Sequence, residues 1–587
     1  MIAYILISLL TANLFYLVAI SVFPIIGIDF SLPTYILILF FCLFFLKKYT
    51  FKYFYTKYSF FSLFLFILLL FMIFIKFPLY YPNHDGMAYH LMAGEYAFNI
   101  WGNNNFMPMH LFTYSFPLVQ MINSFLINIF GIRFSSLLIF ILLSLWFVSL
   151  HARLQDLVRV KINKLVLSAF FILIPFIPYI VATHGSFMAD YFSIILVLEA
   201  LYLFISKQKD KTFAAIVSLL AIFVKLSTSV FIIPVFVYFF IKNQKHIKKK
   251  IVAFFFIAFL IFSIRLYIET GNPFPGLFNS YFKSPLYALS NFKDMRWGPS
   301  GFFEVLIWPI YGQFTSRFGE IEISKVPLIF FSILSAIGYL GSIIMLFLKR
   351  KMEYLIIIFC YLLWSIFTGY SRYFIPLNIL AILFLIIDLK LTKIKFVKKY
   401  LKSKYLNKYK YIFLLLIVIF ALTSFKTDFA WRPYPSLRTF ENNKIYFDEY
   451  RKGLSYIYKD NPLNIAESIE RDFEGYDAIM PVYRGAVTFY SYLAQINGLS
   501  IIKGITKQEY YEIIKSNKVG SKIKENLIQA FKVPRILIVV DKNQESEIDN
   551  LYITKVYYCF KINNASNPKY IQHSGFENIV RYSCIRK

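Results

Sequence analysis

Long runs of apolar residues dominate the chain up to residue 425, and short polar stretches separate them. A helix that crosses the hydrocarbon core of a bilayer needs roughly 17–25 apolar residues. The runs that meet or approach this length are 2–26, 32–46, 59–78, 134–150, 164–182, 190–206, 213–241, 251–268, 326–348, 353–369, 373–389 and 411–425. They predict an α-helical polytopic membrane protein with about 12–13 transmembrane helices.

The run 213–241 differs from the others because it is too long for one ordinary span. Polar residues interrupt it at Lys225, Ser227 and Thr228. We therefore expect either a broken helix or a hairpin of two short helices at this point.

Basic residues gather in alternate loops between these runs. The loops lie at 47–57, 153–164, 207–211, 242–250, 349–351 and 390–410, and they hold 28 of the 62 lysines and arginines. Cytoplasmic loops of membrane proteins carry such an excess. The pattern predicts a cytoplasmic N-terminus and places the chain after residue 425 on the opposite side of the membrane.

Residues 426–587 are charged throughout and contain no run long enough to span a bilayer. The apolar stretches 478–483 and 536–540 are typical of buried strands, and 507–531 has helical spacing. We expect an extracytoplasmic α/β domain here, after a transmembrane core at 59–425 and an additional N-terminal hairpin with its loop at 1–58. Cys559 and Cys584 could form a disulfide on an oxidising side of the membrane, or they could be two separate buried thiols. Cys42 and Cys360 lie inside predicted spans.

The composition supports the membrane interpretation. Hydrophobic residues make up 58% of the chain and charged residues only 16%, which excludes an ordinary water-soluble protein. The net charge of +30 would suggest nucleic acid in a soluble chain. Here the basic loops account for most of it, so we expect no nucleic-acid partner and attribute the charge to topology and to anionic lipids.

Candidate chemistry lies in the long outward loops, 79–133 and 269–325. The first contains His84, Asp85, His90 and Glu95. The carboxylates of Asp85 and Glu95 could face one cavity. Asp85 could equally be a helix N-cap or a solvated charge. Residues 115–131 are amphipathic, and we expect them to form an interfacial helix that lies on the bilayer.

Further polar groups lie near the outer ends of the predicted spans. His184 and Asp190 flank the start of one span, and Asp190 could simply favour the helix N-terminus. Ionisable residues in apolar runs are costly, which makes them candidates for function by default. The cations of this kind are Lys225, Arg265 and Arg372, and Tyr373 follows Arg372 directly. Arg296 lies in the outward loop 269–325, where it and Trp297 could contact a sugar or phosphate. Each cation could bind a phosphate or could be a structural, ion-paired group.

The order of these features is informative. The outward Asp85 is followed by a Pro-Leu-x-Gln helix ending in Phe130-Gly131, by Asp190 at the start of a span, by Gly271-Asn272-Pro273, and by Ser371-Arg372-Tyr373 with Pro376. Over residues 59–425 this arrangement resembles the GT-C superfamily of integral-membrane glycosyltransferases, most closely bacterial aminoarabinose and mannosyl transferases.

The resemblance implies an enzyme of the bacterial cytoplasmic membrane. Such an enzyme moves a sugar from a polyprenyl-phosphate donor to an extracytoplasmic lipid, glycan or protein acceptor, with inversion. Asp85 would act as general base, Asp190 would be the second acidic residue, and Arg372 and Lys225 would be candidates for the lipid phosphate. Gly86 follows Asp85 where relatives often have an acidic residue, so a divalent cation is left open and no other cofactor is expected.

Two functions of other classes remain open from the residues alone. A transporter or flippase for a lipid-linked glycan would also have a broken helix, although secondary transporters usually repeat it in a second half of the chain. A non-catalytic protein of envelope glycan assembly would bind a glycan or a partner through residues 426–587.

Overall fold

The protein was analysed as a computed structural model. The structure describes residues 2–22, 32–50, 59–76, 94, 116–158, 161–177, 179–180, 188–274, 278–287, 297–315, 317, 326–388, 475–482, 499–502, 504–562 and 579–587. The predicted span 411–425 lies outside these residues.

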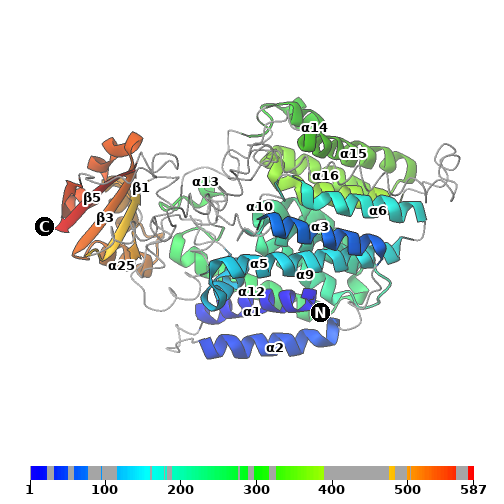
Figure 1. The fold of residues 1–587 in the computed structure, drawn as a ribbon, viewed down its shortest axis with the longest axis horizontal. Helices are drawn as coiled ribbons and strands as arrows, with labels where there is room; N and C mark the ends of the chain where they lie inside the picture. The colour runs from blue at the N-terminus through cyan, green and yellow to red at the C-terminus, as the bar shows by residue number, and fades with distance from the viewer. Residues whose placement is uncertain are drawn as a thin grey trace.

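A bundle of apolar helices makes up the larger part of the molecule, and its long helices run side by side (Figure 1). The helices before the central hairpin are α1 (Ile2–Val22), α2 (Leu32–Thr50), α3 (Phe60–Lys76), α5 (Leu118–Leu157), α6 (Lys161–Leu173) and α8 (Asp190–Ile205). Those that follow are α9 (Thr212–Val224), α10 (Leu226–Ser229), α11 (Ile233–Lys242), α12 (Lys249–Thr270), α13 (Asn279–Phe282), α14 (Phe302–Tyr311), α15 (Val326–Lys349), α16 (Met352–Phe367) and α17 (Ile375–Asp388).

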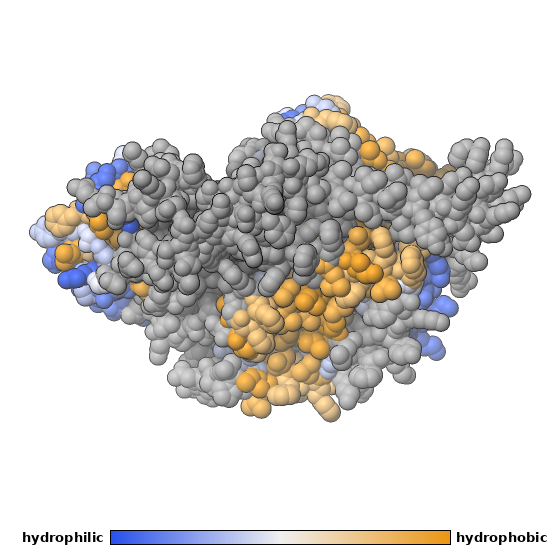
Figure 2. Space-filling view, viewed as in Figure 1, coloured by the Kyte–Doolittle hydropathy of each residue, from blue (hydrophilic) through white to orange (hydrophobic). Residues whose placement is uncertain are grey.

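The bundle has the apolar character of a multi-pass membrane protein, as the sequence predicted. Among the described residues, four stretches are by themselves long and apolar enough to cross a bilayer: Ile2–Ala19, Phe134–Leu157, Lys249–Thr270 and Ser371–Asp388. Hydrophobic side chains gather on the flank of the bundle, and hydrophilic ones gather toward the two ends of the molecule (Figure 2). Exposed Phe254, Ile257 and Ile264 on α12 illustrate a face suited to lipid.

The region 213–241 forms a hairpin of two short helices, which is one of the two forms that the sequence left open. Helix α9 ends at Val224, Lys225 is extended with φ −154° and ψ 91°, and the chain returns through α10 and α11. Polar side chains at the break and the proline at the start of α11 explain why one continuous helix does not form.

Two expectations about loops were wrong. Residues 118–127 do not form a helix of their own, because they continue without a break into the rest of α5, and Gln120 and Asn123 are buried. Their position on the bilayer surface stays a prediction. Arg153 is not a loop cation, since it lies inside α5 and is fully buried. The sequence also missed α14, which lies within the outward loop 269–325.

The C-terminal domain is α/β, as expected from its pattern. Its sheet has the order β2-β1-β3-β5-β4, built from β1 (Ala478–Val482), β2 (Ser500–Ile501), β3 (Arg535–Asp541), β4 (Tyr557–Lys561) and β5 (Ile579–Arg586). Strands β1, β2 and β3 are parallel, and β5 is antiparallel to both β3 and β4. The helices α24 (Lys507–Lys515) and α25 (Ser521–Ala530) accompany the sheet.

Cys559 and Cys584 lie directly opposite each other on β4 and β5 and form a disulfide. Cys42 and Cys360 are free and buried. The domain lies at one end of the bundle (Figure 1), where the backbone N–H of Gly520, before α25, donates to the Glu269 carbonyl at 2.9 Å. The domain is thereby docked on the end of α12.

Candidate functional site

Three of the residues selected from the sequence meet in one buried cluster. The Asp190 carboxylate accepts from the Arg372 guanidinium through two contacts, Nε to Oδ1 and Nη2 to Oδ2, both 3.0 Å. The Lys225 ammonium lies 2.5 Å from Oδ2 of the same carboxylate. The side chains are 7% exposed for Asp190 and Arg372 and 12% for Lys225. The carboxylate therefore holds two cations in fixed positions.

Each member comes from a helix end or a helix break. Asp190 is the first residue of α8, where a negative charge is stabilised by the helix dipole. Lys225 lies at the break after α9, and Arg372 lies in a short 3-10 turn, Ser371–Phe374, between α16 and α17. A membrane bundle tolerates such non-helical backbone where it is buried within the protein or lines a cavity.

Three contacts position the turn that carries Arg372. Gly369 has φ +61°, and a Cβ there would lie 2.5 Å from the Cα of Gly298, so only glycine fits. The indole N–H of Trp308 on α14 donates to the Gly369 carbonyl at 2.8 Å. The ring of Trp297 stacks on Tyr370 with centroids 5.5 Å apart. The unpredicted helix α14 thus supports the segment leading to Arg372.

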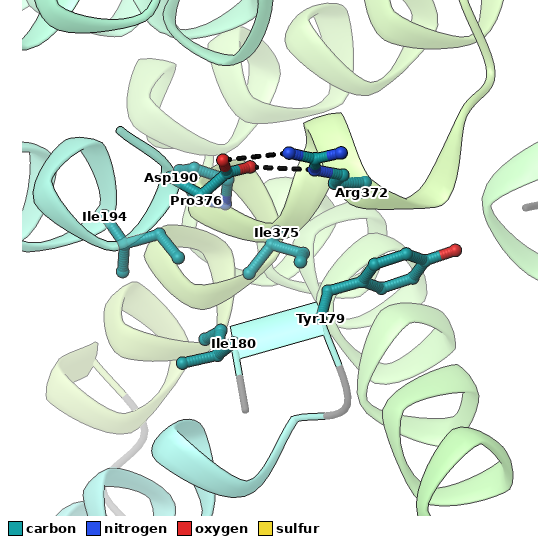
Figure 3. A pocket seen from close by; sticks show the side chains of 7 residues that line it. All are labelled: Tyr179, Ile180, Asp190, Ile194, Arg372, Ile375 and Pro376. Carbon is teal, nitrogen blue, oxygen red and sulfur yellow. Dashed lines mark hydrogen bonds and ion pairs between the residues drawn. The ribbon is translucent and has the colours of Figure 1, made fainter. Parts of the chain in front are cut away.

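The cluster borders a small recess (Figure 3). The recess is shallow, with room for about one water-sized group, and it is lined by Tyr179, Ile180, Asp190, Ile194, Arg372, Ile375 and Pro376. The paired charges lie along one side, and Ile180, Ile194 and Ile375 lie below them (Figure 3). A ligand that carries an anionic group next to an apolar portion would match this division.

The opposite ends of these helices carry the lysine-rich turns. Lys351 pairs with Asp388 at 2.5 Å, and Lys242 pairs with Glu353 at 2.6 Å. These contacts bring the end of α17, the start of α16 and the end of α11 to one level. The Asp190 cluster is therefore at the end of the bundle away from the lysines.

Helix lengths place the cluster below the far end of the bundle. At 1.5 Å per residue, the 16 residues of α8 reach roughly 24 Å, whereas the 22 residues of α12 reach roughly 33 Å. The hydrocarbon core of a bilayer is about 30 Å thick. Because α8 and α12 begin or end at the same lysine-rich level, the cluster is recessed by roughly 9 Å relative to the end of α12.

The ion pairs determine what each group can do. A carboxylate held by a guanidinium and an ammonium is strongly favoured in its charged form and makes a poor proton acceptor. The three side chains together carry one net positive charge. In a partly desolvated recess, such a surplus attracts an anion more strongly than it would in water.

The other candidate residues lie in different places. Tyr373 lies beside the cluster, with the Lys225 ammonium 5.9 Å from its ring centroid. Arg265 pairs with Glu269 at 2.7 Å, one turn further along α12, and is not among the partners that the structure describes for Asp190. His84, Asp85, His90, Glu95, His184 and Arg296 lie outside the described residues.

The described residues contain no group of three or more His, Cys, Asp or Glu side chains placed to bind a metal ion. The Asp190 carboxylate already has two cationic partners. The cluster therefore does not fit a divalent cation, and Asp85, where the sequence left one open, lies outside the described residues.

One residue of the first outward loop is described. Gly94 is helical and buried, and a Cβ at this position would lie 2.2 Å from the Gln120 carbonyl oxygen and 2.3 Å from the Ser124 hydroxyl. The loop that contains Asp85 is thus in close contact with the start of α5 at this point.

Sequence reasoning also missed a second buried ion pair. Arg153 on α5 binds Glu199 on α8 through two 2.6 Å contacts, from Nη1 to Oε1 and from Nη2 to Oε2. Glu199 is the only acidic residue in the interior of the apolar run 190–206, and this could have marked it.

No known protein family matches the chain by its sequence profile, and no curated protein matches it in sequence. Solved structures are similar in fold. One is ArnT from Cupriavidus metallidurans bound to undecaprenyl phosphate, with TM-score 0.48, 11% identity, and coverage of 89% of this chain and 97% of that chain. Another is the archaeal oligosaccharyltransferase AglB from Archaeoglobus fulgidus in complex with an inhibitory peptide and a dolichol-phosphate, with TM-score 0.41, 13% identity, and coverage of 83% and 70%.

These solved structures belong to the GT-C class that the sequence motifs resemble. At such identities and TM-scores the likeness assigns neither a reaction nor the roles of residues. The function has to be argued from the site itself.

Proposed function

We propose that the protein is a membrane glycosyltransferase that moves a sugar from a polyprenyl-phosphate donor to an acceptor on the side of the membrane opposite the lysine-rich turns. The observation that carries the proposal is the Asp190 carboxylate holding Lys225 and Arg372 at an apolar recess. A polyprenyl phosphate combines an anion with a hydrocarbon chain, which is the combination that this recess suits. Its depth in the bundle lets such a lipid approach from the bilayer.

The cations have the larger role in this mechanism. As the bond between the anomeric carbon and the phosphate oxygen breaks, its electron pair passes to the phosphate, which gains negative charge. Cations that are already fixed at that position stabilise the developing charge without reorganisation. Arg372 suits a phosphate because its planar guanidinium can make two parallel hydrogen bonds, whereas Lys225 supplies a point charge.

Asp190 serves in this scheme as a positioning residue. The sequence resemblance placed it among the catalytic residues, but two cations hold its carboxylate. Its negative charge keeps Lys225 and Arg372 ionised and oriented at low exposure. The general base is then Asp85, which would take the proton from the acceptor hydroxyl as that oxygen bonds to the anomeric carbon from the opposite face, with inversion. His84 and His90 are the alternative bases in the same loop.

The proposed orientation has the lysine-rich turns in the bacterial cytoplasm and the C-terminal domain outside. The excess of basic residues at that end of the bundle supports this orientation. The Cys559–Cys584 disulfide supports it independently, because disulfides persist in oxidising compartments. The division into an N-terminal hairpin, a catalytic bundle and an outer α/β domain is part of the same proposal.

The experiment uses the full-length protein in lipid nanodiscs. Native mass spectrometry measures the binding of undecaprenyl phosphate, and turnover is then measured with a panel of radiolabelled undecaprenyl-phosphate sugars and bacterial envelope acceptors. Lys225→Met should weaken binding of the lipid. Asp85→Asn should abolish turnover and leave lipid binding intact. If no polyprenyl phosphate binds the wild-type protein, the proposed function is wrong, and undiminished turnover by Asp85→Asn would remove that residue as the base.

One observation favours a second function. The hairpin from α9 to α11 reverses at Lys225 within the bundle, and transporters bind substrates at such discontinuous helices. A flippase for a lipid-linked glycan would use the same recess. Movement of a fluorescent lipid-linked glycan across proteoliposomes, with no covalent product, would identify this function.

A further inference from the structure

The contacts that the structure describes for the buried pair of Arg153 and Glu199 are with groups other than Asp190, Lys225 and Arg372. Both side chains are 0% exposed. The indole N–H of Trp146 donates to Oε2 of Glu199 at 2.8 Å, and the Arg153 guanidinium lies 4.7 Å from the ring centroid of Tyr202. Removing two charges from water is costly, and well-packed apolar residues often give equal or better stability at such a position. The pair therefore calls for an explanation other than stability.

The position of Glu199 on α8 supplies one. Glu199 follows Asp190 by nine residues, which is about 900° of helical rotation, or half a turn beyond two full turns, and roughly 14 Å along the axis. The two carboxylates therefore project from opposite faces of α8. One is held by Arg153 from α5, and the other is held by Arg372 from the turn before α17.

The pattern of apolar and polar residues does not select one rotation of this helix. All residues of α8 except Tyr202 and Ile205 are buried, so α8 has no exposed polar face that would distinguish one rotation from another. Directional polar contacts can fix a register that hydrophobic contacts leave open. A rotation of about 20° would move a carboxylate about 6 Å from the axis by roughly 2 Å, which is enough to break a two-contact ion pair.

We propose that Arg153 and Glu199 are positioning residues that fix the rotation of α8 and so direct Asp190 toward Arg372 and Lys225. Its consequence for the substrate rests on the proposed function, in which those two cations bind the lipid phosphate. The contact with Arg153 holds α8 from the side opposite the recess. Without it, the carboxylate of Asp190 samples several directions and holds the two cations less well.

A thermal double-mutant cycle tests, without any substrate, whether the Arg153–Glu199 pair fixes the rotation of α8. We call this action of the pair the clamp. The paired variant Arg153→Met/Glu199→Met removes both charges together, so that no buried charge is left alone. We expect this variant to fold and Asp190→Asn to lower its melting temperature by less than half of the drop that Asp190→Asn causes in the wild-type background. Equal drops in the two backgrounds would overturn the proposal.

The exposed pair of Lys242 and Glu353 supplies the matched control. Its side chains are 50% and 15% exposed, and it lies at the lysine-rich end of the bundle. In the Lys242→Met/Glu353→Met background, Asp190→Asn should cause the same drop in melting temperature as in the wild-type protein. A similarly reduced drop in this background would mean that removing any ion pair weakens the effect of Asp190→Asn on the melting temperature. That result would count against the clamp.

The swapped variant Arg153→Glu/Glu199→Arg retains an ion pair between α5 and α8. In this background Asp190→Asn should lower the melting temperature by as much as it does in the wild-type protein. If neither paired variant accumulates as folded protein, the pair is needed for the fold itself, and the positioning proposal is wrong. Binding of undecaprenyl phosphate gives the functional readout, with an expected loss of at least tenfold in the paired methionine variant. A wild-type protein that does not bind this lipid defeats the proposed function, while the thermal cycle still decides the clamp.

Discussion

Arg372 and Asp190 are 182 residues apart in sequence and form a buried ion pair in which both oxygens of the carboxylate are held at 3.0 Å. Lys225 contacts the same carboxylate from a third segment of the chain. This relationship joins α8, the break after α9 and the turn before α17. It also gives Asp190 a role in holding cations, whereas the sequence resemblance implied that Asp190 is the second acidic residue near the catalytic base.

Asp190→Asn should destabilise the protein strongly. The amide keeps the shape of the side chain but leaves the two cations facing each other without a counter-charge. Loss of one partner of a buried pair typically costs about 3–5 kcal/mol. Thermal unfolding in detergent measures the change. Glu353→Gln is the control, because its partner Lys242 is half exposed, and a loss of no more than about 1 kcal/mol is expected there. Similar losses in both variants would contradict the buried character of the Asp190 cluster.

Arg372→Lys tests the geometry of the guanidinium separately from its charge. A lysine can satisfy one carboxylate oxygen but cannot reproduce two parallel contacts. We expect the affinity for undecaprenyl phosphate, measured by native mass spectrometry, to fall at least about tenfold, since a charged hydrogen bond contributes about 1.5–3 kcal/mol. Arg317→Lys is the matched control, because Arg317 also binds a carboxylate, that of Glu304, at 3.0 and 3.1 Å. Unchanged affinity in Arg372→Lys would remove Arg372 from the phosphate site.

The sequence predicted the parts of the fold that depend on local pattern. Apolar runs identified the helices, and the polar interruption at Lys225 identified the break in the run 213–241, because hydrophobic length and charge placement act within one segment. Helix α14 was missed, since its ten residues are too short to count as a span. The continuous helix α5 was divided in two because Gln120 and Asn123 suggested exposure to water, whereas both side chains are buried.

The candidate site could be predicted only in part for a related reason. Asp190, Lys225 and Arg372 were each selected as ionisable groups near apolar runs, but which of them meet is a matter of tertiary packing. Arg265 had the same sequence signature and is instead paired with Glu269 on its own helix. Arg153 was assigned to a loop because it follows a long span, and its buried partner Glu199 was not considered.

Gly94→Ala should disturb the first outward loop. The added methyl group would meet the Gln120 carbonyl and the Ser124 hydroxyl at 2.2 and 2.3 Å, and the backbone carbonyl cannot move aside without shifting α5. Small residues permit such close helix contacts in membranes. We expect turnover to fall more than tenfold, with undecaprenyl phosphate binding reduced less than threefold, because the proposed base Asp85 lies in this loop. Gly301→Ala is the control, since nothing lies within 4 Å of a Cβ there. Normal turnover in Gly94→Ala would separate the loop from catalysis.

Single cysteines should report the orientation of the bundle. Lys245 lies in a lysine-rich turn, Ser300 lies beside α14 at the other end, and both are exposed. In intact cells a membrane-impermeant maleimide should label Ser300→Cys, and it should label Lys245→Cys only after the membrane is permeabilised. The native free thiols Cys42 and Cys360 are buried, and the parent protein without a new cysteine measures their background. Labelling of Lys245→Cys in intact cells would reverse the proposed topology.

Reduction of the Cys559–Cys584 disulfide should destabilise the C-terminal domain. The bond joins neighbouring strands across a separation of 25 residues, and closing a loop of this size stabilises a fold by about 3 kcal/mol in the chain-entropy description. We expect limited proteolysis of the full-length protein to cut this domain faster in the presence of reductant. The double variant Cys559→Ser/Cys584→Ser should be cut equally fast with and without it. A Cys42→Ala/Cys360→Ala variant should respond to reductant as the wild-type protein does, because those thiols are not bonded. If the rate of cleavage in the wild-type protein does not change on reduction, the disulfide makes no contribution to the stability of the domain.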